Sequence, residues 1–222
     1  MLKLFKKREI NKSEEDELAE LRKNLTEAID ENIKIAEEDI QNIKTLLLQN
    51  KSYQTDFFNS LYNSSIYISI FDMDVSILTE KFILSKRDYE KKLFARILAL
   101  TIIEFLDDIN PLIGRDLSKQ LRDLKQEKFV IPVREISKKF AKYKNENEQY
   151  LRIVRNNTIA HKNTDALELH KFINEIESEE IYNLAIELKK LSTEFNKLST
   201  KIIYSIIDFM KKSINKRKKN HY

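Results

Sequence analysis

The chain of 222 residues carries 40 basic and 36 acidic side chains, for a net charge of +4, and it contains no cysteine. This composition excludes a disulfide framework and a thiolate metal site. The chain has one glycine, Gly114, and two prolines, Pro111 and Pro132. Because hairpins and tight turns depend on these two residue types, we expect an all-α fold of long helices joined by few turns.

The charge is distributed unevenly along the chain. Residues 1–12 carry five basic and one acidic side chain, residues 13–40 carry three and eleven, and residues 201–222 carry seven and one. Basic ends of this kind bind nucleic acid or an anionic surface, or only keep a protein soluble, and composition alone does not decide between these roles.

The sequence predicts a cytoplasmic protein without a membrane segment. The first ten residues lack the apolar region of a signal peptide. The longest notable uncharged stretch, residues 57–71, has 15 residues and several polar ones, whereas a helix that spans a bilayer needs about 20 mostly apolar residues.

Apolar residues at intervals of three and four predict two long helices in the first part of the chain. In the first helix they run from Leu18 to Leu47, and Ser13 is its expected N-cap. In the second they run from Phe57 to Phe82, although residues 65–71 alternate in a way that resembles a strand.

The third predicted helix is the most apolar one. We expect it to begin at the capping residue Ser85 and to end at Asn110, because Pro111 follows. Its middle, residues 95–106, predicts the central buried helix of the fold. Further helices are predicted at residues 114–126, 132–156, 165–176 and 178–212.

We expect these helices to form one antiparallel bundle, because no internal repeat or flexible linker divides the chain. In this interpretation residues 1–84 are an N-terminal helical hairpin packed on the bundle, residues 85–212 are the bundle with its long last helix, and residues 213–222 are a basic tail.

Several common chemistries lack their motifs in this sequence. With one glycine, neither a P-loop nor a dinucleotide-binding fingerprint is possible in its usual form. The three histidines do not have metal-ligand spacing, so we expect no metal and no cofactor. The acidic clusters Glu14–Glu17 and Glu37–Asp39 could hold a divalent ion, but such clusters are more typical of a solvated helix face.

One constellation stands out, at residues 151–163, which read LRIVRNNTIAHKN. Arg155 and His161 are six positions apart, so they point in different directions on an unbroken helix. They converge only if the helix ends or bends between them, which Asn156 and Asn157 would permit. The alternative is a helix-end arginine and histidine that bind only carbonyls or nearby carboxylates.

Together the two side chains would supply a permanent cation for a phosphate and an imidazole that exchanges protons near neutral pH. These are the groups required to cleave RNA without a metal. The imidazole would assist attack by the ribose 2′-hydroxyl, and the guanidinium would stabilise the charge that builds on the phosphoryl oxygens.

The string RNNTIAHKN resembles the motif of HEPN-domain proteins, in particular the branches tied to abortive infection and toxin–antitoxin systems. The resemblance implies a helical bundle, often a homodimer, whose active members are metal-independent endoribonucleases with two motifs in one cleft. It implies a phosphate-binding role for Arg155, an acid–base role for His161 and an orienting role for Asn156. It also implies RNA as the substrate, phage defence as the setting, and an antitoxin or other defence protein as a partner.

Two features depart from that family or extend beyond its motif. HEPN toxins paired with nucleotidyltransferase antitoxins have a tyrosine two positions after the histidine, where this chain has Asn163. Glu104 lies inside the apolar third helix, where an unpaired carboxylate is costly. We expect it either to orient Arg155 or to pair with Arg96 of its own helix.

The alternative to a nuclease is a non-catalytic helical module for protein–protein interaction.

Overall fold

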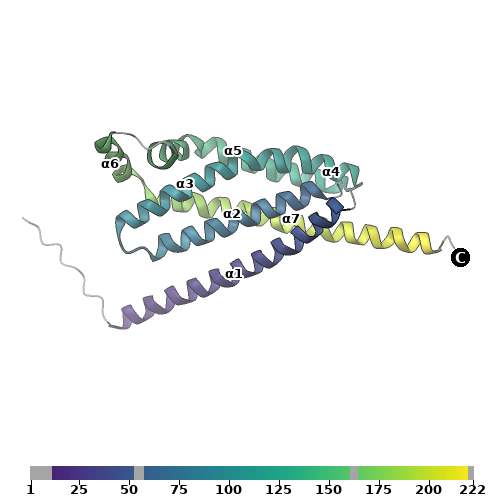
Figure 1. Ribbon diagram of the computed structural model, residues 1–222, viewed down its shortest axis with the longest axis horizontal. Coiled ribbons are helices and arrows are strands. Elements are labelled where there is room, and N and C mark those ends of the chain that lie inside the picture. The colour runs from purple at the N-terminus through teal and green to yellow at the C-terminus, as the bar shows by residue number, and fades with distance from the viewer. Residues whose placement is uncertain (1–11, 53–57, 161–164, 220–222) are drawn as a thin grey trace, which may run out of the picture.

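The computed structural model describes residues 12–52, 58–160 and 165–219, and in these ranges it is an all-α helical bundle (Figure 1). Among these residues no strand occurs. In chain order the elements are α1 (Lys12–Ser52), α2 (Asn59–Leu84), α3 (Asp88–Asn110), the π-helix η1 (Pro111–Leu117), α4 (Ser118–Asp123), the 3-10 helix η2 (Glu127–Phe129), α5 (Val130–Arg155), the π-helix η3 (Asn156–Ala160), α6 (Ala166–Glu175) and α7 (Ser178–Lys219).

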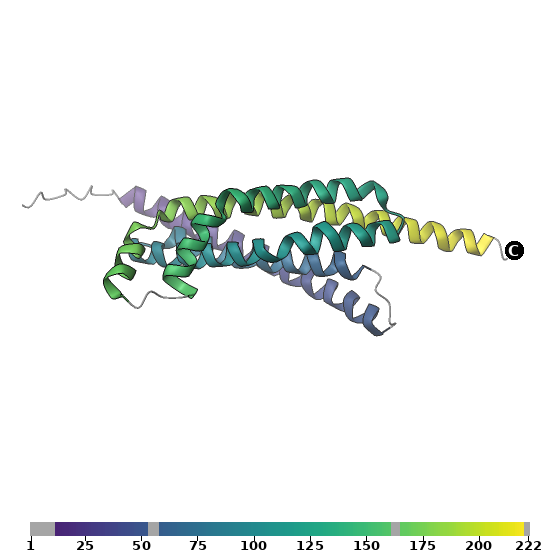
Figure 2. The ribbon, with the colours of Figure 1, turned by 90° about the horizontal axis from the view of Figure 1, so that it is seen from above.

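Four long helices, α2, α3, α5 and α7, surround the hydrophobic core (Figure 2). The apolar middle of α3 is almost completely buried, which confirms the prediction of a central helix. Its Phe105 ring stacks on Phe71 of α2, with ring centroids 3.8 Å apart, and meets the edge of Phe140 of α5. Aromatic side chains therefore join three of the four helices at one level of the core.

The apolar stripe predicted for the last helix faces this core. Leu188, Phe195 and Ile202 of α7 are fully buried. Farther along, α7 extends beyond the bundle (Figure 1), and Phe209 is 48% exposed. The helix continues to Lys219, so residues 213–219 of the segment interpreted as a basic tail are helical.

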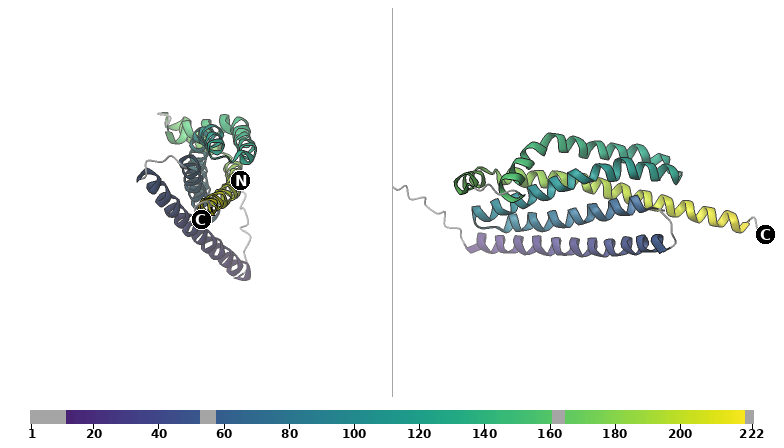
Figure 3. Two further views of the ribbon diagram at one scale, coloured as in Figure 1. Left: turned by 90° about the vertical axis from the view of Figure 1, so that its right-hand side faces the viewer. Right: turned by 45° about the horizontal axis from the view of Figure 1, so that its top comes forward.

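Helix α1 packs mainly on α2 and lies on the outside of the bundle (Figure 3). Its predicted stripe is only half-buried, at positions such as Ile29, Ile33 and Ile40. By contrast, α2 contributes fully buried residues, including Ile68 and Val75, to the same core as α3 and α7. The stretch whose alternation resembled a strand is therefore part of a core helix.

Polar side chains form a partly buried seam between α2 and α7. Ser192 donates a hydrogen bond to Asp72, and Asn196 Nδ2 donates to Asp72 Oδ2 over 3.1 Å. One turn away, Lys189 Nζ donates to Ser76 Oγ at 2.5 Å. Paired polar groups of this kind fix the register of two helices, because any shift would leave buried groups unsatisfied.

Two predicted helix starts are wrong, for local reasons. The first helix already includes Lys12, so Ser13 lies inside it. Ser85 does not cap α3. It follows the end of α2, where its hydroxyl donates to the Lys81 carbonyl, and the Glu90 carboxylate accepts from the Arg87 backbone N–H at the start of α3.

The third helix ends at Asn110, as predicted. Pro111 does not end the helical path of the chain, however, because the backbone continues through it with helical angles as the π-helix η1. In an α-helix the proline ring would clash with the carbonyl four residues earlier. The wider π-helical turn has a different hydrogen-bond register, and we infer that it accommodates both the ring and the missing N–H.

No helix in the described ranges has the length and apolar character needed to cross a membrane.

Candidate functional site

The candidate site lies where α5 changes into the π-helix η3. Arg155 is the last residue of α5, and Asn156 is the first of η3. In η3 the Asn157 side chain donates to the Ile153 carbonyl over 2.9 Å, and Thr158 donates to the Val154 carbonyl over 2.6 Å. Side chains that bind the carbonyls four residues earlier compete with the α-helical ladder. Asn147 makes the same contact with the Tyr143 carbonyl inside α5 without a change of register, so these two bonds accompany the π-helical turn after Arg155 and do not by themselves cause it.

Two neighbours hold the Arg155 guanidinium. Its Nη2 lies 2.6 Å from Glu104 Oε1 of α3, and its Nη1 donates to Asn156 Oδ1 over 3.2 Å. The Arg155 side chain is 26% exposed and that of Glu104 is 53% exposed. Arg155 Nε is buried and has no hydrogen-bond partner among the described residues. The guanidinium is therefore fixed at the edge of the bundle, with part of its donor capacity unused.

Of the two partners considered for Glu104, the structure brings it to Arg155. Arg96, the other candidate, is buried and donates from Nε to the Lys92 carbonyl, with its guanidinium over the Tyr89 ring. Although Arg96 and Glu104 are two turns apart on one helix, the long Arg96 side chain lies toward the start of α3. The predicted alternative of a Glu104–Arg96 ion pair is therefore wrong.

A second ion-pair cluster lies one turn from the first. Arg152 Nη2 and Lys144 Nζ of α5 each lie 2.6 Å from Asp107 Oδ1 of α3. Burial alone would raise the pKa of Asp107, but the hydrogen bonds from Lys144 and Arg152 outweigh it and lower that pKa below its usual value.

This second cluster was not predicted from the sequence, although its signal was present there. Asp107 follows Glu104 by three positions, and Arg152 precedes Arg155 by three. The two helices therefore carry matching charges at helical spacing, and the pairs connect α3 to α5 along one face. Next to them, Tyr67 of α2 donates to Asp108 Oδ2 over 3.2 Å, and burial raises the pKa of Tyr67.

The other predicted site residues have different positions. Asn156 contacts Arg155, as described above, while Asn157 binds the backbone of its own helix and shapes η3. His161 and Asn163 lie outside the described residues, so the predicted approach of His161 to Arg155 stays a prediction. The structure thus brings together Arg155, Asn156 and Glu104.

Within the described ranges, no three histidine or carboxylate side chains gather in a way that could hold a metal ion. The functional group that the structure fixes at the end of α5 is the Arg155 guanidinium. Such a group binds a phosphate or carboxylate, and it keeps its charge at every physiological pH.

Compared with known proteins, the chain matches no family model, and neither the curated proteins nor the solved structures contain a significant match.

Proposed function

We propose that this protein is a metal-independent endoribonuclease of the HEPN type, which uses Arg155 and His161 at a cleft shared by two copies of the chain. The observation that carries the proposal is the fixed Arg155 guanidinium at the α5–η3 junction, six positions before His161. The resemblance of RNNTIAHKN to the HEPN motif supplies the reaction, the cytoplasmic setting in phage defence and the dimer.

In the proposed reaction the 2′-hydroxyl of one ribose attacks the adjacent phosphorus and loses its proton to a base. The bond from phosphorus to the 5′-oxygen breaks, and that oxygen takes up a proton. The products are a 2′,3′-cyclic phosphate and a 5′-hydroxyl. His161 exchanges the protons, and Arg155 stabilises the charge on the two non-bridging oxygens.

The contacts of Arg155 are compatible with this role. A guanidinium has five N–H donors, and the bonds to Glu104 and Asn156 account for two of them. Nε is buried, so the donors left for a phosphate oxygen are the second N–H groups of Nη1 and Nη2. Glu104 then acts as a positioning residue that holds the guanidinium plane against α3.

The test is to incubate RNA with the purified wild type, with Arg155→Ala and with His161→Ala, each in the presence of EDTA. Only the wild type should leave cyclic-phosphate and 5′-hydroxyl ends. His170→Ala is the matched control, since His170 lies exposed on α6, where Asn174 is its hydrogen-bond partner, and it should retain full activity. Intact RNA after incubation with folded wild type, or equal cleavage by His161→Ala, would refute the proposal.

A non-catalytic interaction module is the second candidate function, and the surface of α1 favours it. Leu21, Ile35 and Leu48 of this helix are between 51% and 65% exposed, on a helix whose first part is strongly acidic. In this case the wild type and His161→Ala would affect bacterial growth and RNA integrity equally.

A further inference from the structure

The end of the bundle opposite Arg155 is strongly basic. Residues 115–144 carry ten basic and four acidic side chains, and residues 189–219 carry ten and two. Because α5 and α7 pack antiparallel, with Lys139 of α5 bound to Glu194 of α7, both basic segments lie toward the same end of the bundle. Residues 146–188, toward the Arg155 end, carry four basic and nine acidic side chains. The positive charge is therefore concentrated at one end.

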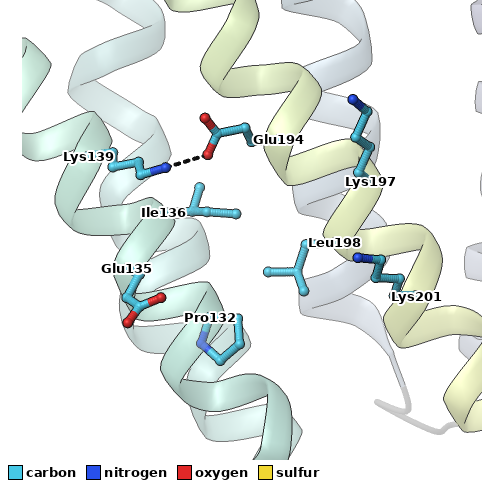
Figure 4. A pocket seen from close by; sticks show the side chains of 8 residues that line it. All are labelled: Pro132, Glu135, Ile136, Lys139, Glu194, Lys197, Leu198 and Lys201. Carbon is cyan, nitrogen blue, oxygen red and sulfur yellow. Dashed lines mark hydrogen bonds and ion pairs between the residues drawn. The ribbon is translucent and has the colours of Figure 1, made fainter.

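A hollow of about 340 Å³ opens between the two helices at the basic end (Figure 4). Its apolar side chains are Pro132 and Ile136 of α5 and Leu198 of α7. The ion pair between Lys139 and Glu194, 2.6 Å long, crosses one end of it. The remaining lining side chains are Glu135, Lys197 and Lys201.

Lys197 and Lys201 are exposed on successive turns of α7. In the described part of the chain, no carboxylate lies within ion-pair distance of either lysine. Two adjacent ammonium groups that are not neutralised repel each other, and a ligand with several negative charges relieves this repulsion. The hollow thus presents cations beside an apolar surface.

A second hollow, of about 330 Å³, continues in the same direction along α7. Ser205, Asp208 and the half-exposed Phe209 line it from α7, and Lys125, Gln126 and Lys128 line it from the segment that precedes α5. The row of cations therefore extends past Lys201 and gains a half-exposed aromatic ring.

We propose that these two hollows, together the α5–α7 groove, bind the phosphate backbone of single-stranded RNA. Proteins that bind single strands combine a basic groove for the backbone with aromatic side chains on which bases stack. Lys197 and Lys201 supply the first element and Phe209 supplies the second. The choice of RNA over DNA rests on the proposed function, whereas the binding of a polyanion rests on the groove alone.

The groove also sets a minimum length for RNA that both sites can share. Lys139 and Arg155 lie on one helix, about 24 Å apart along its axis at about 1.5 Å per residue, but Lys139 faces α7 and Arg155 faces α3. A stacked strand covers the axial distance alone with about seven nucleotides, at about 3.4 Å each. Shorter RNA does not reach from the groove to Arg155 of the same copy, and RNA that does so is longer, because it also passes around α5.

The test measures binding of a fluorescent single-stranded RNA that carries 2′-O-methyl groups, so that it cannot be cleaved. The change is Lys197→Gln with Lys201→Gln in the full chain. The matched control is Lys23→Gln with Lys34→Gln, which removes the same charge from exposed positions on α1. We expect the groove variant to bind roughly 10-fold more weakly and its log–log salt slope to be smaller by about 1.4, because each lost phosphate contact removes about 0.7.

Phe209→Ala should weaken binding several-fold and leave the salt slope unchanged, because a stacking contact releases no counterion. Equal affinity of the groove variant and the α1 control would overturn the proposal. Binding of the wild type to vesicles that contain phosphatidylserine, without binding to RNA, would overturn it too. Because this RNA cannot be cleaved, the binding assay tests the groove even if the protein is not a nuclease. In the same way, cleavage of short RNA tests the nuclease proposal even if the groove does not bind RNA.

Discussion

Asp72 gives a prediction about stability whose magnitude follows from the structure. Burial between α2 and α7 raises the pKa of its carboxyl group from 3.8 to about 6. Hydrogen bonds from Ser192 and Asn196 and the nearby Lys189 favour the charged form, but burial outweighs them. The rise corresponds to about 3 kcal/mol in favour of the protonated folded state.

The sign of the pH effect follows from this rise. Between about pH 4 and about pH 6 the folded state binds the Asp72 proton and the unfolded state has released it. The free energy of unfolding therefore falls as the pH increases through this window, by up to about 3 kcal/mol. Below the window both states are protonated, and the full stability is present.

Asp72→Asn should remove this dependence, because asparagine has nearly the same shape and does not titrate. Its oxygen still accepts from the Ser192 hydroxyl, and the Asn196 amide must turn over to present its oxygen to the new N–H groups. Urea unfolding followed by circular dichroism gives the free energy of unfolding at each pH. The wild type should lose stability relative to Asp72→Asn across the window, whereas Asp39→Asn, at an exposed position on α1, should follow the wild type.

A constant difference between the wild type and Asp72→Asn from about pH 4 to about pH 7 would refute this reasoning. A wild type that gains stability over the variant as the pH increases would refute it more strongly. In that case the hydrogen bonds of Asp72, and not its burial, would dominate the energetics of the seam between α2 and α7.

Two further substitutions test individual contacts. Glu104→Gln keeps a hydrogen-bond acceptor for Arg155 but removes the negative charge. We therefore expect kcat for RNA cleavage to fall roughly 10-fold to 100-fold, with unchanged thermal stability. Full activity of this variant would show that Glu104 has no positioning role. Gly114→Ala would bring a new Cβ to 2.8 Å from Ser137 Oγ, which donates to Asn110. In a Ser137→Ala background, Gly114→Ala should therefore raise the free energy of unfolding by about 1 kcal/mol, and in the wild type it should raise it by less. Equal effects in both backgrounds would contradict the predicted contact.

The sequence predicted the elements whose apolar pattern is dense and regular. The middle of α3 and the stripe of α7 have few polar interruptions, so their burial follows from helical spacing alone. The ends of the helices were harder to predict, because they depend on competition between local groups. Pro111 interrupts an α-helix but not a π-helix, and Ser85 has a carbonyl of the preceding helix within reach.

The candidate site was predictable only in part, because its contacts join different helices. Spacing along α3 identified Arg96 as a partner for Glu104, but it could not reveal that Arg155 of α5 packs against the same face. The matched positions of Asp107 and Arg152 show that a search for equal charge spacing on two predicted helices would have found the pairing.

The electrostatics of the bundle argue for a division of labour between its two ends. At the Arg155 end, cations are paired with Glu104 and Asp107, and residues 146–188 carry five more acidic than basic side chains, so this region does not attract a polyanion from solution. Long-range attraction depends on net charge, whereas stabilisation of a reacting phosphate depends on a few donors held in fixed positions. A neutralised but rigid Arg155 suits the second task and not the first. The lysines of the α5–α7 groove, among them Lys197 and Lys201 without carboxylate partners in the described structure, suit the first. An RNA-cleaving role for this fold therefore requires both ends, and binding and cleavage should respond to different substitutions.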